Sequence, residues 1–494
     1  MSISSSMDEK DGPAAEGGKR GLDSLLQDAV WYSSANVITK ILSLSSFPLL
    51  ARHFSTENFG VIELFGTIAP LIAFATSFGQ DSAVARFFHE ACHHKDRQQL
   101  ISESFWYQLT LVIPITLILW FLAPFIFEIF KFTDNSVSIL RIVILQGPFC
   151  LFYNYSLVIL KWSSARRVYV GLVILSAGLY GILILLGTIF LNINVETLFW
   201  FNFTNQAVFG ILGLFFIRKW IVLPTAIQHL PRLLAYAVPL GFAAIMANML
   251  PVGEKWITAR LLSVEEVGLY AAGGRIAVLV AFMAESFQSA WVPFAYRIYR
   301  QNNVQSIFSK TIIVFSSVIL LLVFVLAALA VPLIEFLASE RYIEGAVVVF
   351  PVALGLALLC IAKVIEVSLG IGMKPRLIMY GGLIRMLITF GLIFELAPIF
   401  GLQGVALGCL GGCAAQAAAV TLFVRRTTTE TWNLTELSPI IVAASLGGVF
   451  FVTAQHYFGL KMGSYIAWVS VVMIGVAGWI SYRKAVVNHK ISLI

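Results

Sequence analysis

The sequence predicts an all-α polytopic membrane protein with about 14 transmembrane helices, arranged as two parallel six-helix lobes plus two C-terminal helices. Of its 494 residues, 59% are hydrophobic and 12% are charged, whereas about a quarter of a soluble domain is charged. Long apolar stretches recur along the whole chain, and one pattern occurs twice, 208 residues apart. This composition excludes a soluble enzyme, a secreted disulfide scaffold and a disordered chain.

The transmembrane helices are expected where about 20 mainly apolar residues follow one another. Fourteen segments meet this requirement, near residues 28–50, 58–83, 101–127, 137–160, 168–191, 196–217, 233–258, 266–295, 310–335, 343–370, 376–398, 402–424, 438–458 and 464–482. Residues 1–27 are mostly polar and are expected to form a disordered cytoplasmic tail. No signal peptide is expected, because a long acidic stretch precedes the first apolar segment.

The orientation follows from the distribution of Lys and Arg between the connections. The even-numbered connections and the two tails carry 22 of them, whereas the odd-numbered connections carry five. Because cytoplasmic loops are enriched in positive charge, both termini are expected to be cytoplasmic and the number of spans to be even.

An internal repeat relates the two halves of the chain. Ala51–Gln80 and Ala259–Gln288 match at 12 of 30 positions without a gap, which indicates duplication. Six spans lie between the copies, so the halves have the same orientation and are parallel repeats, as in transporters with a central cavity. The predicted divisions are an N-lobe at 28–217, a linker at 218–232, a C-lobe at 233–425, and a C-terminal unit with spans 13 and 14 at 426–494.

Four positions of this repeat have a structural interpretation. Ser55 and Ser263 are suited to cap the N-terminus of the following helix. Gly60 and Gly268 are suited to close helix approach.

The stretch Pro48–Glu90 also carries a resemblance to a known family. Its elements are Ala51-Arg52, Ser55, Phe59-Gly60, Gly79 with Asp81 and Ala83, and Arg86-Phe87. They resemble the opening of Wzx-type lipid-linked oligosaccharide flippases, which are polysaccharide biosynthesis proteins of the multidrug/oligosaccharidyl-lipid/polysaccharide (MOP) exporter superfamily. The second copy, with Ala259-Arg260, Ser263 and Val267–Tyr270, resembles the same family.

This resemblance implies a V-shaped, MATE/MOP-like transporter of the inner (plasma) membrane rather than an enzyme. It would move an undecaprenyl-pyrophosphate-linked oligosaccharide from the cytoplasmic to the periplasmic leaflet by alternating access, for cell-surface polysaccharides such as O-antigen. Expected partners are this lipid-linked glycan, membrane lipid, a glycan polymerase or glycosyltransferase, and H⁺ or Na⁺ as the coupling ion. No cofactor, metal or nucleic acid is expected.

Charged residues inside the spans are the candidate site residues, because a charge in the bilayer is costly unless it faces a cavity or a partner. Lys40, Lys255 and Arg275 lie in spans expected to line the central cleft, and we predict that they bind the pyrophosphate. The alternative is pairing within the protein, with Glu254 beside Lys255. Glu63 and Glu285 are predicted to be counter-ions or, alternatively, sites of the coupling ion.

Other charged residues have more local interpretations. Asp81 and Arg86, near the cytoplasmic end of span 2, are predicted to form a gate, with helix capping as the alternative. Arg141 and Arg385 are placed near span ends, where their side chains can reach the membrane surface. His89–His93 matches HExxH, a zinc-protease pattern, but it has no convincing third ligand in the sequence.

Three other functions remain open beside the flippase. A cation-coupled drug or metabolite antiporter of the same fold would need an acidic site in the N-lobe, whereas this lumen is expected to be basic. A membrane glycan polymerase or ligase would need a large external loop, whereas every external connection has about ten residues or fewer. A non-transporting scaffold would leave the charges inside the spans unexplained.

Overall fold

All regular structure in the described part of the chain is helical. The computed structural model describes residues 31, 34, 37–90, 93–130, 136–163, 165–224, 227–298, 304–371, 375–427 and 438–491. The predicted tail at 1–27 lies outside these residues. After a helix at 37–53, the elements are α2 (Thr56–Phe65), α3 (Ile68–Ser77), α4 (Gln80–Glu90), α5 (His94–Phe130), α6 (Ser136–Trp162), α7 (Arg166–Leu186), η1 (Gly187–Leu191), α8 (Val195–Ile217), η2 (Arg218–Trp220), α9 (Leu230–Leu261), α10 (Val264–Ala277), α11 (Leu279–Ile298), α12 (Val304–Ala328), α13 (Ala330–Leu337), η3 (Glu340–Gly345), α14 (Ala346–Ile371), α15 (Pro375–Thr427), α16 (Ser438–Phe458) and α17 (Leu460–Ile491).

The described residues contain 11 helices that are long and apolar enough to cross a membrane. One of them, residues 376–427, consists of two helices, because Gly401 has non-helical torsion angles (φ 57°, ψ −136°). The helix at 37–53 and helix α9 are not among the 11. The expectation of 14 spans therefore stays a prediction, whereas the all-helical membrane fold is confirmed.

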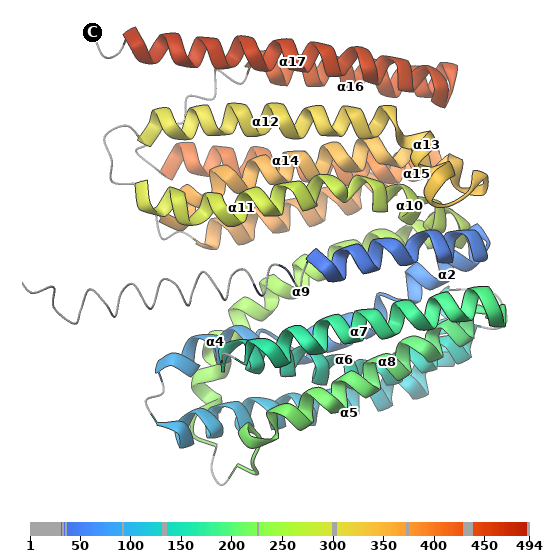
Figure 1. Ribbon diagram of the computed structural model, residues 1–494, viewed down its shortest axis with the longest axis vertical. Coiled ribbons are helices and arrows are strands. Elements are labelled where there is room, and N and C mark those ends of the chain that lie inside the picture. The colour runs from blue at the N-terminus through green and yellow to red at the C-terminus, as the bar shows by residue number, and fades with distance from the viewer. Residues whose placement is uncertain are drawn as a thin grey trace, which may run out of the picture.

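The helices form two groups (Figure 1). Helices α4 to α8 make the lower group in this view, and α10 to α17 make the upper group. The helix at 37–53, α2 and α9 lie between the groups, and α9 packs on α3 and α4 as well as on α10 and α15. A site between the groups is therefore lined by these connecting helices.

The repeated turn builds a close contact between α2 and the upper group. Ser55 Oγ accepts a hydrogen bond from the Asn58 N–H at 3.2 Å, and Ser263 Oγ accepts one from the Glu266 N–H at 3.2 Å, so both predicted N-caps are confirmed. Ser55 caps α2 and Ser263 caps α10, and these two helices pack against each other.

Two glycines allow α2 and α10 to approach backbone to backbone. A Cβ atom on Gly60 would lie 1.9 Å from the Val264 carbonyl oxygen, and one on Gly268 would lie 2.1 Å from the Thr56 carbonyl oxygen. No larger residue fits at either position without separating the helices. The predicted close approach is confirmed. It is formed between the two copies of the repeat, with α2 from the first copy and α10 from the second.

The segment predicted as one span at 58–83 is divided into α2, α3 and α4. Helix α3 ends at Phe78, which has a left-handed conformation (φ 41°), and Gly79 follows with φ 78°. A Cβ on Gly79 would lie 2.4 Å from the Ala237 carbonyl oxygen, and one on Gly241 would lie 2.6 Å from the Phe78 carbonyl oxygen. The break between α3 and α4 therefore packs backbone to backbone against α9. The sequence pattern indicated neither the break nor this contact.

The two halves of α15 form an antiparallel pair through three glycines. Cβ atoms on Gly404, Gly408 and Gly412 would lie within 3.0 Å of Leu396, Ile393 and Thr389, respectively. A GxxxGxxxG spacing places the three glycines on one helix face. They let this part of α15 pack closely against the part before Gly401.

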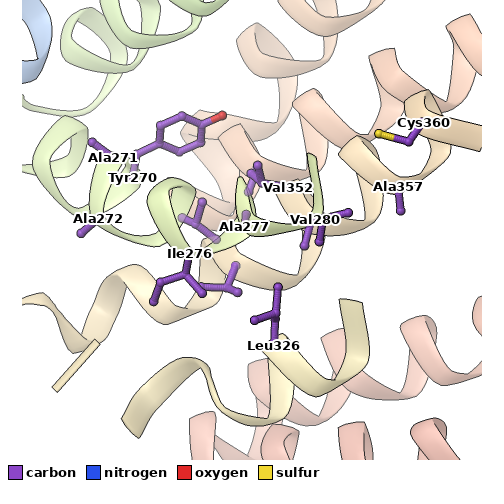
Figure 2. Close-up of a cluster of buried hydrophobic side chains, with 14 of the residues drawn as sticks. Tyr270, Ala271, Ala272, Ile276, Ala277, Val280, Leu326, Val352, Ala357 and Cys360 are labelled. Atoms are coloured by element: carbon purple, nitrogen blue, oxygen red, sulfur yellow. The ribbon is translucent and has the colours of Figure 1, made fainter. Parts of the chain in front are cut away.

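The upper group has an apolar core between α10, α11, α12 and α14. Figure 2 shows Ile276, Ala277 and Val280 gathered with Leu326 and Val352, all of them buried. Such close packing holds α10 and α11 rigidly against α14. It therefore holds the side chains that α10 and α11 direct to the connecting helices.

The segment before α9 is held by one buried carboxylate from α5. Glu103 accepts hydrogen bonds from the backbone N–H groups of Gln228, His229 and Leu230 at 3.1, 2.7 and 2.7 Å. A carboxylate at a helix N-terminus satisfies free N–H groups and interacts favourably with the helix dipole. Glu103 thus ties the start of α9 to the lower group.

Candidate functional site

A cavity of about 410 Å³ lies where the connecting helices meet the upper group. Its wall comes from the helix at 37–53 and from α2, α9, α10, α11, α14 and α15. Most of the lining is apolar, and the charged residues on the wall are Lys40, Glu63, Glu254, Lys255, Arg275 and Arg385. The structure thus brings all three predicted pyrophosphate ligands to one cavity.

Glu63 of α2 holds two of the three cations. Lys255 Nζ of α9 lies 2.8 Å from Glu63 Oε2, and the Arg275 guanidinium of α10 contacts Glu63 Oε1. The side chains are 12% exposed for Glu63, 20% for Lys255 and 29% for Arg275. At this burial, removing one member leaves poorly solvated charge, so the three side chains form one electrostatic unit.

Arg275 is also held between aromatic rings. Its guanidinium lies 5.0 Å from the ring centroid of Phe47 and 5.4 Å from that of Phe59. Phe47 and Phe59 are both fully buried. Cation–π contact of this kind fixes the direction of the guanidinium without neutralising it.

Lys40 is paired with the other predicted acid. It contacts Glu285 of α11, and its ammonium lies 4.6 Å from the centroid of the Phe282 ring. This pair is more open to solvent than the Glu63 cluster, with side-chain exposures of 39% for Lys40 and 58% for Glu285. Its contribution to stability is correspondingly small.

The structure corrects the suggested pairing of Lys255 with Glu254. Successive residues of a helix point in different directions, so Lys255 reaches Glu63 of another helix. Glu254 is buried, and its Oε2 accepts a hydrogen bond from the Tyr270 hydroxyl at 3.2 Å.

Arg385 also belongs to the cavity and not to the membrane surface. The prediction placed it near the inner end of its span, but it lines the same wall as Lys255 and Arg275. Position 385 is nine residues beyond the predicted start at 376, and a helix rises about 1.5 Å per residue. This rise places it about 14 Å into the membrane. The position of Arg385 within its predicted span therefore already indicated that the side chain lies deep in the membrane.

The two predicted gate residues do not meet in this structure. Arg86 Nε lies 3.7 Å from Glu90 Oε1, and its guanidinium lies over the Tyr236 ring of α9. Asp81 Oδ1 is buried and has no hydrogen-bond partner among the residues that the structure describes. The contact between α4 and α9 instead contains an ion pair that sequence analysis missed, Arg232 to Glu90 at 2.6 Å.

The HExxH pattern is only partly covered by the structure. Two of its residues, Ala91 and Cys92, lie outside the described part of the chain, and Glu90 is engaged by Arg86 and Arg232. Where the side chains are described, no group of three or more His, Cys, Asp or Glu is placed to hold a metal ion.

Comparison with known proteins assigns the chain to a protein family. The profile of the family described as "Polysaccharide biosynthesis protein" matches residues 25–299, which is more than half of the chain. The chain belongs to this family. No curated protein matches the chain in sequence.

Solved structures establish the fold. The lipid II flippase MurJ in an inward closed conformation matches with a TM-score of 0.69 at 16% identity, over 94% of this chain and 99% of that chain. An inward-facing multidrug resistance MATE family transporter of the MOP superfamily matches with a TM-score of 0.62 at 15% identity, over 78% and 94%. A mutant of the Vibrio cholerae MATE transporter VcmN matches with a TM-score of 0.55 at 14% identity, over 80% and 98%. The chain is therefore a multi-pass membrane protein with the MOP fold.

Proposed function

We propose that the protein is a flippase for an undecaprenyl-pyrophosphate-linked oligosaccharide, moving it from the cytoplasmic to the outer leaflet of the inner membrane by alternating access. The observation that carries this proposal is the convergence of Lys40, Lys255 and Arg275 on one cavity where the connecting helices meet the upper group. Family membership supports a role in cell-surface polysaccharide synthesis, such as that of O-antigen. The solved relative named a lipid II flippase has the same fold.

The chemistry of the cavity suits a diphosphate diester. Such a group carries two negative charges and only hydrogen-bond acceptors, and guanidinium and ammonium groups are its natural partners. The cavity wall carries four cationic side chains and two acidic ones, Glu63 and Glu254. The surplus of positive charge favours an anionic substrate.

Glu63 and Glu285 act as counter-ions in this proposal. In this structure Glu63 pairs with the partly buried Lys255 and Arg275, and Glu285 pairs with the more exposed Lys40. Pairing avoids the cost of leaving a partly buried cation without a partner. An incoming diphosphate offers the same cations a second partner. Exchange between internal carboxylate and substrate phosphate would then let the two helix groups separate and close again without exposing bare charge.

The alternative, a cation-coupled antiporter for drugs or metabolites, has one supporting observation. Glu63 and Glu254 face a largely apolar cavity, as an acidic cation site would require. In that case a positively charged substrate would compete with Lys255 and Arg275 for Glu63. The excess of basic side chains on the same wall argues for the flippase.

Binding of undecaprenyl diphosphate to the full chain in lipid nanodiscs tests the proposal. Replacing Arg275 by Gln, or Lys255 by Met, should weaken binding about tenfold or more, because each change removes a charge-assisted hydrogen bond. Arg141→Gln is the matched control, since Arg141 packs on the Trp120 ring and does not line the cavity. Unchanged binding in both cavity variants, with the fold intact by thermal melting, would reject a diphosphate site in this cavity.

A further inference from the structure

A second cavity adjoins the cationic one. It has a volume of about 500 Å³ and lies between the helix at 37–53 and α11. Lys40, Leu44 and Phe282 line both cavities. The Lys40–Glu285 ion pair therefore stands at the boundary between two neighbouring spaces.

The polar groups of the second cavity are mainly hydrogen-bond acceptors. The Ser286 hydroxyl donates its proton to the Phe282 carbonyl at 3.1 Å, and the Ser289 hydroxyl donates to the Ser286 carbonyl at 2.8 Å. Each hydroxyl oxygen therefore retains lone pairs for a ligand but has no proton to give. The Glu285 carboxylate is likewise an acceptor, which leaves Lys40 as the one charged donor among the described residues of this wall.

The two cavities thus have opposite hydrogen-bonding character. The first presents the donors Lys255, Arg275 and Arg385, whereas the second presents Glu285 and two serine oxygens. A diphosphate, which can only accept, is suited to the first and disfavoured by the second. A ligand with several O–H donors is suited to the second, and sugars are the polyols that a lipid-linked glycan carries next to its diphosphate.

We propose that the second cavity is the subsite for the sugar units nearest the diphosphate, with Glu285, Ser286 and Ser289 accepting hydrogen bonds from their hydroxyl groups. This inference rests on the proposed function and assigns the substrate's carbohydrate part to a separate set of residues. When the diphosphate draws Lys40 into the first cavity, Glu285 loses its partner and accepts sugar hydroxyls instead. The Lys40–Glu285 pair would thereby couple occupation of the two subsites.

The position of the second cavity agrees with the geometry of the substrate. Its residues lie toward the start of the helix at 37–53 and in the first 11 residues of α11, which belong to the later half of the predicted span at 266–295. Both of these segments lie toward the cytoplasmic side in the topology predicted from the distribution of Lys and Arg. The glycan of a lipid in the cytoplasmic leaflet extends from its diphosphate in that direction.

The test compares three probes bound to the full chain in nanodiscs: undecaprenyl diphosphate, and the same lipid linked to a single N-acetylglucosamine or a single galactose. The wild type should bind both sugar-linked probes more tightly than the sugar-free one. The double change Ser286→Ala/Ser289→Ala should weaken the sugar-linked probes about tenfold and leave undecaprenyl diphosphate unchanged. Ser45→Ala is the matched control, because the Ser45 hydroxyl also donates to its own helix at 2.8 Å but lines neither cavity.

Glu285→Gln provides a second variant. It should weaken the sugar-linked probes and leave undecaprenyl diphosphate binding equal or tighter, because Lys40 is then released from its acidic partner. If the sugar-linked probes bind no more tightly than the sugar-free lipid, or if neither variant affects them selectively, the sugar subsite is refuted while the diphosphate site stands. If undecaprenyl diphosphate itself binds independently of Arg275, the proposed function fails instead.

Discussion

Replacing Gly60 by Ala should open the contact between α2 and α10. The new Cβ would lie 1.9 Å from the Val264 carbonyl oxygen, and ordinary contact begins at 3.4 Å, so the helices must separate by about 1.5 Å. The Thr56 Oγ1 to Glu265 Oε1 hydrogen bond, 2.6 Å long, would then stretch to about 4 Å and break.

Both effects destabilise the contact between α2 and α10 in Gly60→Ala. Overpacking costs about 1–3 kcal/mol, and losing a hydrogen bond to a charged group costs about 1.5–3 kcal/mol. The closed contact should therefore lose about 2.5–6 kcal/mol, and each 1.4 kcal/mol corresponds to about tenfold in population. Gly268→Ala should act in the same way, because its Cβ would lie 2.1 Å from the Thr56 carbonyl oxygen.

Electron-spin distance measurements between the helix groups provide the assay. Spin labels at Leu191→Cys and Glu340→Cys, in a background without the five native cysteines, occupy exposed positions of the two groups. Both lie near this contact, since Ile193 and Tyr342 hydrogen-bond to residues 53–55.

The Gly60→Ala variant should shift the label distances to longer values. The control Gly178→Ala, where a Cβ meets nothing within 4 Å, should not. A folded Gly60→Ala protein with the wild-type distance distribution would refute the claim that this glycine sets the distance between α2 and α10.

Three further changes test the internal contacts through the thermal melting of the full chain. Glu63→Gln should lower the free energy of unfolding by about 3 kcal/mol because it leaves two partly buried cations without an acid. Glu285→Gln, in an exposed pair, should cost less than about 1 kcal/mol, and equal effects would contradict the difference in burial. Glu103→Gln should cost about 2 kcal/mol, since a neutral amide is a weaker cap for the start of α9, and a neutral outcome would show that α9 is held elsewhere. Gly412→Ala should destabilise the packing between the two halves of α15 by about 1–3 kcal/mol. Gly391→Ala in the same helix, which meets no atom within 4 Å, should be neutral or slightly stabilising, and the same loss in both would argue against this packing.

Much of the fold follows from short-range rules in the sequence. The N-caps at Ser55 and Ser263 and the close approaches at Gly60 and Gly268 depend on local chemistry that the repeat displays twice. The glycines of α15 recur every four residues, a spacing that is typical of close helix packing. Each of these features can be recognised because one or two turns of helix define it.

The candidate site could be predicted only in part, because its partners come from distant helices. Charges inside apolar spans identified Lys40, Lys255 and Arg275 as residues that need a cavity or a partner. That Glu63 serves both Lys255 and Arg275 depends on how α2, α9 and α10 pack, which no spacing within one span encodes. The prediction for Arg385 was wrong because it treated nine residues as a position near the span end. At the helical rise per residue, nine residues already reach far into the membrane.

The contacts near the predicted cytoplasmic ends were beyond sequence reasoning for a similar reason. Glu90 and Arg232 are 142 positions apart, and each belongs to a polar stretch in which any acid and base are equally suited to pair. Glu103 lies only two residues into its predicted span at 101–127, where an acid is unremarkable. Its role becomes visible only when the segment before α9 folds back onto α5.

The central claim is tested most directly by measuring which leaflet holds the lipid-linked glycan in cells depleted of this protein, with rescue by wild type or by the double variant Lys40→Ala/Arg275→Ala. We predict that the glycan accumulates in the cytoplasmic leaflet on depletion. Wild type should restore its transfer, and the folded double variant should not. An unchanged leaflet distribution on depletion, in a strain without a redundant transporter, would contradict the flippase function and favour the antiporter.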